Sequence, residues 1–282
     1  MRTASISATI VLALFLACPP LQAESIESLL DQAIAGNHRN AADRARDADR
    51  HPRETLLFFG IQADSAVVEI WPSSGWYTAI LAPVLRPVGV FYAAGFALTA
   101  QRTPQWRKDM QTDLARLMAQ QPAIYDHVVT TELDVPERTT IAPPGSIDLV
   151  LTFRNVHNWM KGDYAPDMFQ VMARALKPGG TLGVVEHRAR PGTSIEDMKK
   201  TGYVTEDHVI ALAAAAGLQL EARSEINANP RDGRDHPAGV WTLPPGFRYC
   251  NTITDPAEKE RCMAKYAAIG ESDRMTLRFR KG

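Results

Sequence analysis

Short apolar runs alternate with segments of helical periodicity along most of the chain. Seven apolar runs predict strands at 66–70, 89–94, 127–131, 147–153, 181–186, 218–226 and 274–279. Apolar residues recur every three to four positions in the helices predicted between them, at 76–85, 104–120, 164–175 and 205–216. This alternation is typical of a mostly parallel sheet with helices on both faces. We therefore expect an α/β fold that binds its ligand at the carboxyl ends of the strands.

Two segments flank this alternating pattern. Residues 24–60 predict a helical lead-in, in which the Arg- and Asp-rich stretch 37–50 is interpreted as a solvated helix with internal charge pairs. Residues 227–270 are rich in Pro, Gly and charged residues and separate the sixth strand from the seventh. We interpret them as an insertion or lid, because loops of that length are usually functional or disordered.

The first 23 residues have the pattern of a secretory signal peptide. Arg2 is followed by an apolar stretch, 6–17, that is too short to span a bilayer, and Leu21-Gln22-Ala23 fits a cleavage region. The residues before Cys18 match a lipobox poorly, which favours release over a lipid anchor. The expected mature protein is one domain, 24–282, that is exported to the periplasm and has no stable membrane span.

Composition and cysteine content narrow the interpretation further. The net charge is −1 and no basic block occurs, so nucleic acid is not expected as the main partner. Downstream of residue 23 only Cys250 and Cys262 remain. In an exported chain this pair predicts a disulfide, worth about 3 kcal/mol for a loop of that size. Two free thiols are the alternative.

The segment 66–78, A-V-V-E-I-W-P-S-S-G-W-Y-T, predicts a buried strand, an acid, a tight turn and a helix start. Free N–H groups at such a helix start form a site for a polar ligand group. The segment resembles motif I of the class I S-adenosylmethionine-dependent methyltransferases, a hydrophobic strand followed by an acid and Gly-x-Gly-x-Gly. Aligned on Glu69, the glycine places fall at Trp71, Ser73 and Gly75.

Two later segments strengthen this resemblance. The sequence D-L-V-L-T-F-R-N-V-H-N-W, 148–159, resembles motif IV of the superfamily, with an R-N-V like that of quinone C-methyltransferases. The sequence A-L-K-P-G-G-T-L, 175–182, resembles the turn before the fifth strand. The resemblance covers 53–226 and the last strand, and is greatest to exported methyltransferases of bacteria. It implies a methyltransferase-like domain, 24–282, with a Rossmann-like, seven-stranded, mostly parallel sheet.

The resemblance implies S-adenosylmethionine as cofactor. The residues it assigns to cofactor binding are Glu69, Trp71, Ser73, Gly75, Trp76, Tyr77, Asp134 and Arg154. Asp134 stands near the place of the acid that meets the adenine amino group. The acid that takes the ribose hydroxyls is replaced by Gly95, which weakens the expected binding. An exported enzyme also needs a supply of this cofactor outside the cytoplasm.

Candidate catalytic residues follow the fourth and fifth strands. His157 is a candidate general base, with Asn155 and Asn158 to orient it, and Glu186 and His187 end the fifth strand. Loop hydrogen bonding is the alternative role for each. No metal site is predicted, because no H-x-H or H-E-x-x-H spacing occurs.

The functional hypothesis is an exported S-adenosylmethionine-dependent methyltransferase acting on a small molecule. One alternative is a ligand-binding protein without turnover on the same fold. The other is a non-methylating enzyme, a lyase or hydrolase, that uses His157 and His187. The sequence predicts neither the methyl acceptor nor the oligomeric state.

Overall fold

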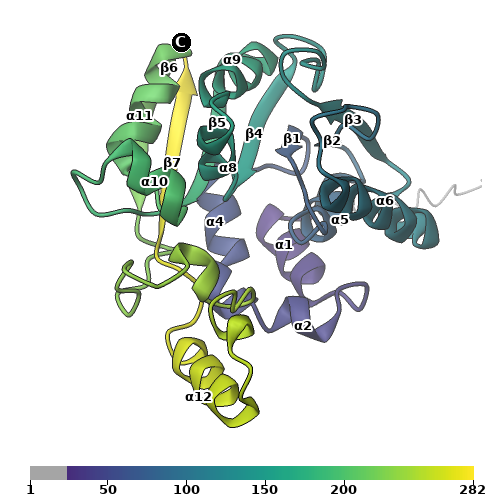
Figure 1. The fold of residues 1–282 in the computed structure, drawn as a ribbon. Coiled ribbons are helices and arrows are strands. Elements are labelled where there is room, and N and C mark those ends of the chain that lie inside the picture. Colours follow the sequence, from purple (N-terminus) through teal and green to yellow (C-terminus); the bar gives the residue numbers. More distant parts are fainter. Residues whose placement is uncertain (1–23) are drawn as a thin grey trace, which may run out of the picture.

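A seven-stranded sheet forms the centre of the molecule. The computed structural model describes residues 24–282, so the predicted signal peptide, 1–23, lies outside the described residues. The strand order is β3-β2-β1-β4-β5-β7-β6, and β7 alone runs antiparallel to its neighbours (Figure 1). The strands are β1 (Ala66–Ile70), β2 (Val90–Phe96), β3 (Val128–Leu133), β4 (Ile147–Phe153), β5 (Leu176–His187), β6 (Leu218–Ser224) and β7 (Arg274–Lys281). The predicted fold class is confirmed.

The two central strands, β1 and β4, pair in parallel with Val67 opposite Leu149. Both are almost wholly buried, which explains why they appear in the sequence as continuous apolar runs. The strand order reverses at β1, because β2 lies on one side of it and β4 on the other. In open α/β sheets this switch point leaves a crevice at the carboxyl ends of the strands.

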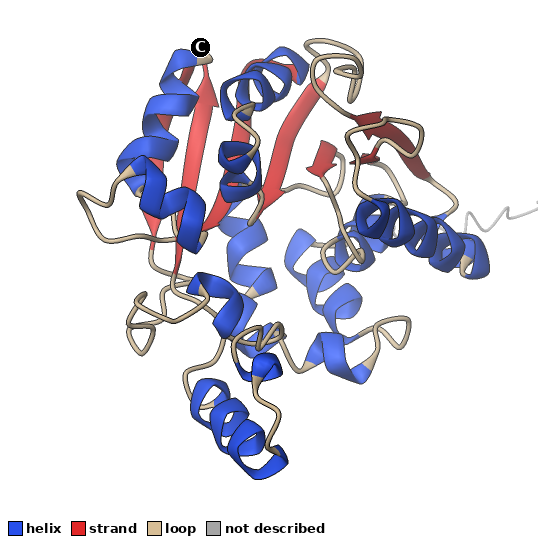
Figure 2. Cartoon of the chain, in the orientation of Figure 1, coloured by secondary structure: helices blue, strands red, loops and turns tan. Residues whose placement is uncertain are grey.

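Helices cover both faces of the sheet (Figure 2). One face packs against α1 (Ile26–Ala35), α4 (Pro52–Phe59), α5 (Thr78–Leu85) and α7 (Pro122–Tyr125). The other face packs against α8 (Val156–Lys161), α9 (Ala165–Ala175) and α11 (Glu206–Ala215). The helix α6 (Gln105–Gln120) contacts β2 and α7, and α10 (Ile195–Thr201) contacts α8.

The lead-in and the insertion meet beyond the carboxyl ends of the parallel strands (Figure 1). The lead-in contributes α2 (Ala41–Arg44) and α3 (Asp47–Arg50). The insertion holds η1 (Gly239–Thr242), η2 (Cys250–Thr252) and α12 (Pro256–Ala267). The predicted disulfide joins Cys250 to Cys262, with Cα atoms 5.6 Å apart. Together with Leu243 and Tyr266, it forms a small separate core.

Two local predictions are wrong. The stretch 37–50 is not a solvated helix, because the Arg39 and Arg50 side chains are buried and the stretch forms two short helices. Arg39 pairs with Asp47, so the predicted charge pairing within the stretch does occur. The helix after β1 begins at Thr78, two residues later than expected, because the preceding turn continues to that residue.

Among the described residues, no helix combines the length and the apolarity that a bilayer span requires.

Candidate functional site

The turn after β1 has a positive φ at each of the three places where the resemblance expects glycine, although two of the glycines are absent. Trp71, Ser73 and Gly75 all have positive φ, at 47°, 57° and 81°. For residues with a Cβ this left-handed conformation costs roughly 1–2 kcal/mol each. The chain therefore holds this turn at Trp71 and Ser73 in spite of local strain.

The Trp71 side chain fills the space between the carboxyl ends of β2 and β3. Its ring centroid lies 4.9 Å from that of Phe96, which ends β2. Its indole N–H donates to the Leu133 carbonyl at the end of β3, at 3.2 Å. The Arg107 guanidinium of α6 covers the ring at 4.5 Å from its centroid. The indole is consequently only 6% exposed.

The neighbouring space beside Gly95 is also filled from α6. The Gln111 side-chain oxygen accepts a hydrogen bond from the Phe96 backbone N–H at 3.1 Å. A Cβ placed on Gly95 would collide with the same Gln111 side chain. The place where the resemblance expects an acid for ribose therefore holds an amide from a different element.

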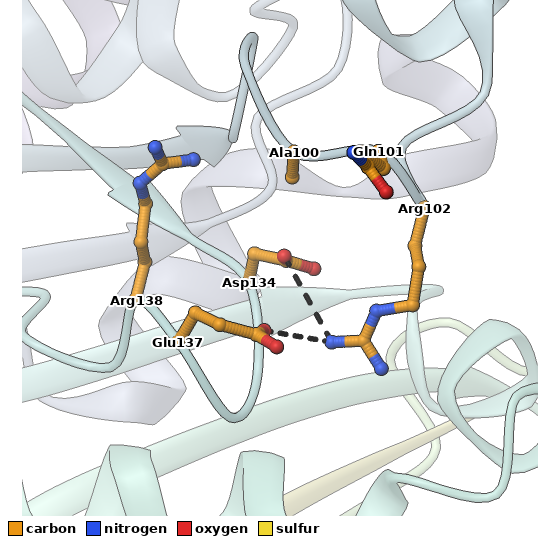
Figure 3. Close-up of a pocket in the computed structure, with 6 residues that line it drawn as sticks. All are labelled: Ala100, Gln101, Arg102, Asp134, Glu137 and Arg138. Carbon is orange, nitrogen blue, oxygen red and sulfur yellow. Dashed lines mark hydrogen bonds and ion pairs between the residues drawn. The ribbon is translucent and has the colours of Figure 1, made fainter.

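These contacts test the predicted cofactor site. The resemblance places ribose at Gly95 and the adenine amino group near Asp134. Trp71 and Gln111 occupy the space between these two positions, so the nucleoside half of S-adenosylmethionine does not fit this structure. Asp134 instead faces a surface cavity of about 540 Å³, 3.9 Å from the Arg102 guanidinium (Figure 3).

The other half of the predicted site is open. A cavity of about 230 Å³ lies against the turn, and six of the eight predicted cofactor residues line it: Glu69, Trp71, Ser73, Trp76, Tyr77 and Arg154. Gly75 and Asp134 do not line it. The Glu69 carboxyl accepts a hydrogen bond from the Thr78 hydroxyl at 2.6 Å. Burial raises the pKa of Glu69 to about 8, against the lowering effect of that hydrogen bond.

Aromatic side chains form the walls of this cavity. Tyr77 stacks on Phe153 with 3.5 Å between ring centroids. Two guanidinium groups contact the Trp76 ring, with Arg39 at 4.9 Å and Arg50 at 4.6 Å from its centroid. These rings stiffen the cavity and give it apolar sides.

A buried histidine–carboxylate pair lies beyond the open cavity. His157 Nδ1 is 2.9 Å from a Glu186 carboxylate oxygen. The Asn158 amide donates to His157 Nε2 at 3.0 Å, which assigns the ring hydrogen to Nδ1. The same carboxylate accepts the His187 backbone N–H at 2.8 Å. The Glu186 carboxylate therefore holds both the His157 ring and the backbone of His187 in place.

His187 lines a second cavity, of about 210 Å³. Its Nδ1 is 2.5 Å from the Ser272 hydroxyl oxygen, and its ring lies 5.1 Å from the His157 ring. Burial, and then the charges of His157 and nearby arginines, hold the pKa of His187 well below its usual value. The imidazole is thus neutral at pH 7. Arg154 and Pro245 line both cavities, which therefore adjoin each other.

Asn155, another predicted site residue, has structural partners. The Asn155 amide donates to the Ile70 carbonyl at 2.9 Å and to the Thr152 hydroxyl, so it joins β4 to β1. Its predicted role in orienting His157 is therefore wrong, and Asn158 makes that contact.

The sequence reasoning missed four polar residues near the two cavities. They are Arg46, Arg50, Glu271 and Ser272, drawn from the lead-in and from the residues just before β7. Two signals were present. The arginines lie four residues apart, and G-E-S-D-R places a run of polar residues directly before a buried strand.

The His157–Glu186 pair and His187 also form a group of side chains that could bind a metal ion. Ligand atoms of His157, Glu186 and His187 lie within 4.8 Å of one another. The positive charges that lower the pKa of His187, among them those of Arg154 and Arg50, oppose a cation at this position.

Comparison with known proteins reveals similarity at the level of structure. No family model and no curated protein matches the sequence. The [4+2]-cyclase SpnF is 16% identical over 91% of this chain and 92% of its own, with a TM-score of 0.56. A geranyl diphosphate C-methyltransferase from Streptomyces coelicolor, solved with Mg²⁺, geranyl diphosphate and S-adenosyl-L-homocysteine, is 12% identical over 89% and 87%, with a TM-score of 0.52. A SAM-dependent methyltransferase from Aquifex aeolicus is 16% identical over 65% and 87%, with a TM-score of 0.50. At these identities the likeness establishes the fold, and the chain has the class I methyltransferase fold.

Proposed function

We propose that the protein is an enzyme that acts on a small molecule by proton transfer at His187, in the two adjoining cavities at the carboxyl ends of β1, β4 and β5. The observation that carries this proposal is a neutral imidazole that faces a cavity beside the buried His157–Glu186 pair. A neutral imidazole in a partly closed site can accept a proton near pH 7. One of the structural relatives, SpnF, is itself described as a cyclase and not as a methyltransferase.

Each polar neighbour has a role in this proposal. When His187 Nδ1 carries its hydrogen toward the Ser272 hydroxyl, Nε2 keeps the lone pair that takes a proton from the substrate. The Glu186 carboxylate, which is held by His157, has an oxygen within 4.8 Å of a ring nitrogen of His187 and can stabilise the imidazolium that forms. Trp241 lies 5.9 Å from the His157 ring and lines the second cavity, where it limits access of water.

Methyl transfer from S-adenosylmethionine is the second candidate. The left-handed backbone at Trp71 and Ser73 favours it, because glycine adopts this conformation without strain and the resemblance expects glycine at both places. Two of the structural relatives are described as methyltransferases. The filled nucleoside half opposes it, since Trp71 and Gln111 would first have to leave their present positions.

Calorimetric titration of the chain 24–282 with S-adenosylmethionine and S-adenosylhomocysteine separates the two candidates. We expect no binding at millimolar cofactor. Micromolar binding that is lost in Glu69→Ala would select methyl transfer instead.

The proton-transfer reaction is tested by incubation with a panel of small esters and hydroxy acids, followed by mass spectrometry. We expect conversion that His187→Ala abolishes and that His127→Ala, a change at an exposed histidine, leaves intact. Binding without conversion across the panel would leave the ligand-binding alternative.

We also propose that the protein acts outside the cytoplasm. The Cys250–Cys262 disulfide supports this location, because such bonds persist in oxidising compartments. Cell fractionation tests the proposal, and recovery of an uncleaved chain in the cytoplasm would contradict it.

A further inference from the structure

Four arginines surround a single buried carboxylate at the meeting point of the two cavities. Guanidinium nitrogens lie 2.6 Å (Arg46), 3.2 Å (Arg50), 3.0 Å (Arg274) and 3.6 Å (Arg154) from the Glu271 oxygens. Burial alone would raise the pKa of Glu271, but these charges outweigh it and lower the pKa to about 2. Four positive charges thus face one negative charge. The cluster keeps an excess of positive charge that Glu271 cannot balance.

Within this cluster, Arg50 has a buried guanidinium nitrogen that lacks a hydrogen-bond partner. Its side chain is 2% exposed, and its Nη1 is buried without a hydrogen-bond partner. A buried guanidinium nitrogen without a hydrogen-bond partner is costly, because it has lost water, and the contact of the group with the Trp76 ring does not replace the lost hydrogen bond. Burial, and then the charge of Arg154, hold the pKa of Arg50 well below its usual value. Both observations indicate that the surroundings of Arg50 favour the binding of an anion.

The open cavity is placed to receive that anion. Arg46, Arg50 and Arg154 all line the 230 Å³ space beside Glu69. The carboxyl of Glu69 is not the balancing charge, because burial raises its pKa to about 8 and leaves it mostly neutral at pH 7. Among the described residues that line this cavity, Glu69 is the one acid. The space is therefore polar and positively charged on the side of the lead-in.

We propose that this cavity is an oxyanion subsite, in which Arg50 and Arg154 hold a carboxylate or phosphate group of the substrate. Planar guanidinium groups bind both kinds of oxyanion through paired N–H donors. This inference rests on the proposed function and names its substrate class.

The second cavity then receives the rest of the molecule. It adjoins the first at Arg154, and its apolar lining includes Val240, Leu243 and Pro244. A substrate with an oxyanion at one end would place its less polar part there, against His187. The two small cavities fit a compact metabolite of this kind better than an extended or cationic one.

Titration with inorganic phosphate and with acetate, at constant ionic strength set by sodium chloride, tests the subsite. Tryptophan fluorescence is the readout, because Trp76 lies against Arg50. We expect saturable binding of at least one anion, weakened at least tenfold in Arg154→Gln. Saturation by phosphate alone would identify a phosphate substrate, and saturation by acetate alone a carboxylate.

Two further variants keep the test decisive if Arg154→Gln folds poorly. Arg46→Gln changes a guanidinium with a side chain 25% exposed, and should weaken the same anion several-fold. Arg102→Gln, in the surface cavity of Figure 3, is the control and should leave binding unchanged. A response that does not saturate, or that is equal in wild type and all three variants, would overturn the proposal.

This outcome is separable from that of the proposed reaction, because anion binding needs no turnover. Saturable phosphate or acetate binding without conversion of any compound would refute the proton-transfer reaction and leave the subsite. Conversion of uncharged esters without anion binding would refute the oxyanion subsite and leave the proton-transfer reaction.

Discussion

Replacement of Trp71 tests whether its indole closes the nucleoside half of the site. The side chain is 6% exposed and packs against Phe96, Trp159 and the Arg107 guanidinium. Removal of a large buried aromatic side chain costs about 3–5 kcal/mol. Trp71→Ala should lower the free energy of unfolding by that amount, since alanine keeps the strain of a positive φ.

Trp71→Gly creates the same cavity but relieves the backbone. Relief of the left-handed conformation returns roughly 1–2 kcal/mol, and the added freedom of glycine in the unfolded chain removes about 0.5–1 kcal/mol of it. We therefore expect Trp71→Gly to be about 1 kcal/mol more stable than Trp71→Ala. Ser73→Gly, at φ 57° in the same turn, creates no large cavity and should be as stable as wild type or slightly more so.

Urea denaturation followed by circular dichroism gives these differences, and calorimetric titration with adenosine gives the second readout. Wild type should not bind adenosine, whereas Trp71→Gly combined with Gln111→Ala should bind it, because neither side chain then fills the nucleoside half. Equal adenosine affinity in wild type and this double variant would refute the closed nucleoside half. A loss below 1 kcal/mol in Trp71→Ala would refute the packing argument.

Three other predictions concern residues around the site. Burial raises the pKa of Glu69 to about 8 from a usual 4.5, so its contribution to stability is complete below pH 4.5 and lost as the pH rises through 8. Glu69→Gln should flatten that dependence in urea denaturation between pH 5 and 9. Gly95→Asp should destabilise the protein modestly, because the added side chain displaces the Gln111 amide from the Phe96 N–H, and Gln111→Ala in the same chain, which keeps helix α6 free of an interior glycine, should restore part of the thermal stability. Cys250→Ser with Cys262→Ser should cost about 3 kcal/mol. The double variant should be cleaved by a protease faster than wild type within 227–270. Wild type with its disulfide reduced should be cleaved at the same rate as the double variant.

The strands were predictable because buried parallel strands carry a strong local signal. The bounds of β1 and β4 agree with the sequence prediction at both ends, since both strands are covered on both faces. The prediction for β5 began at Thr181, but the strand begins at Leu176, which pairs with Ile147 across an irregularity. That pairing depends on the neighbouring strand, and the local K-P-G-G sequence indicates a turn instead.

The site was only partly predictable, because it combines residues that are distant in the chain. Glu69 and Arg154 could be placed by motif, since Glu69 is the last residue but one of β1 and Arg154 directly follows β4. Arg50 and Glu271 are separated by 221 positions, and no local pattern indicates that they meet. Charged residues in a short helix usually point to solvent, so the burial of Arg50 becomes evident only from tertiary structure.

The position of the Trp71 side chain is a second feature that the sequence alone does not predict. Alignment on Glu69 identifies Trp71 as a replacement for glycine and predicts weaker cofactor binding. It does not predict where the indole goes, because that depends on a positive φ and on the carbonyl of Leu133, 62 positions away. Filling of the ligand space by the chain's own side chain is therefore a structural finding.

The arginine cluster also links ligand binding to the stability of the fold. Glu271 receives arginines from the lead-in, from the end of β4 and from the start of β7, so the excess charge repels three separate elements from one another. An anion that binds Arg50 and Arg154 removes part of this repulsion only in the folded chain. By mass action it should add about 2.7 kcal/mol at a concentration one hundred times its Kd. A phosphate- or carboxylate-bearing substrate would thus hold the lead-in against the sheet while it is bound, and the site would be most rigid when the reacting group lies beside His187.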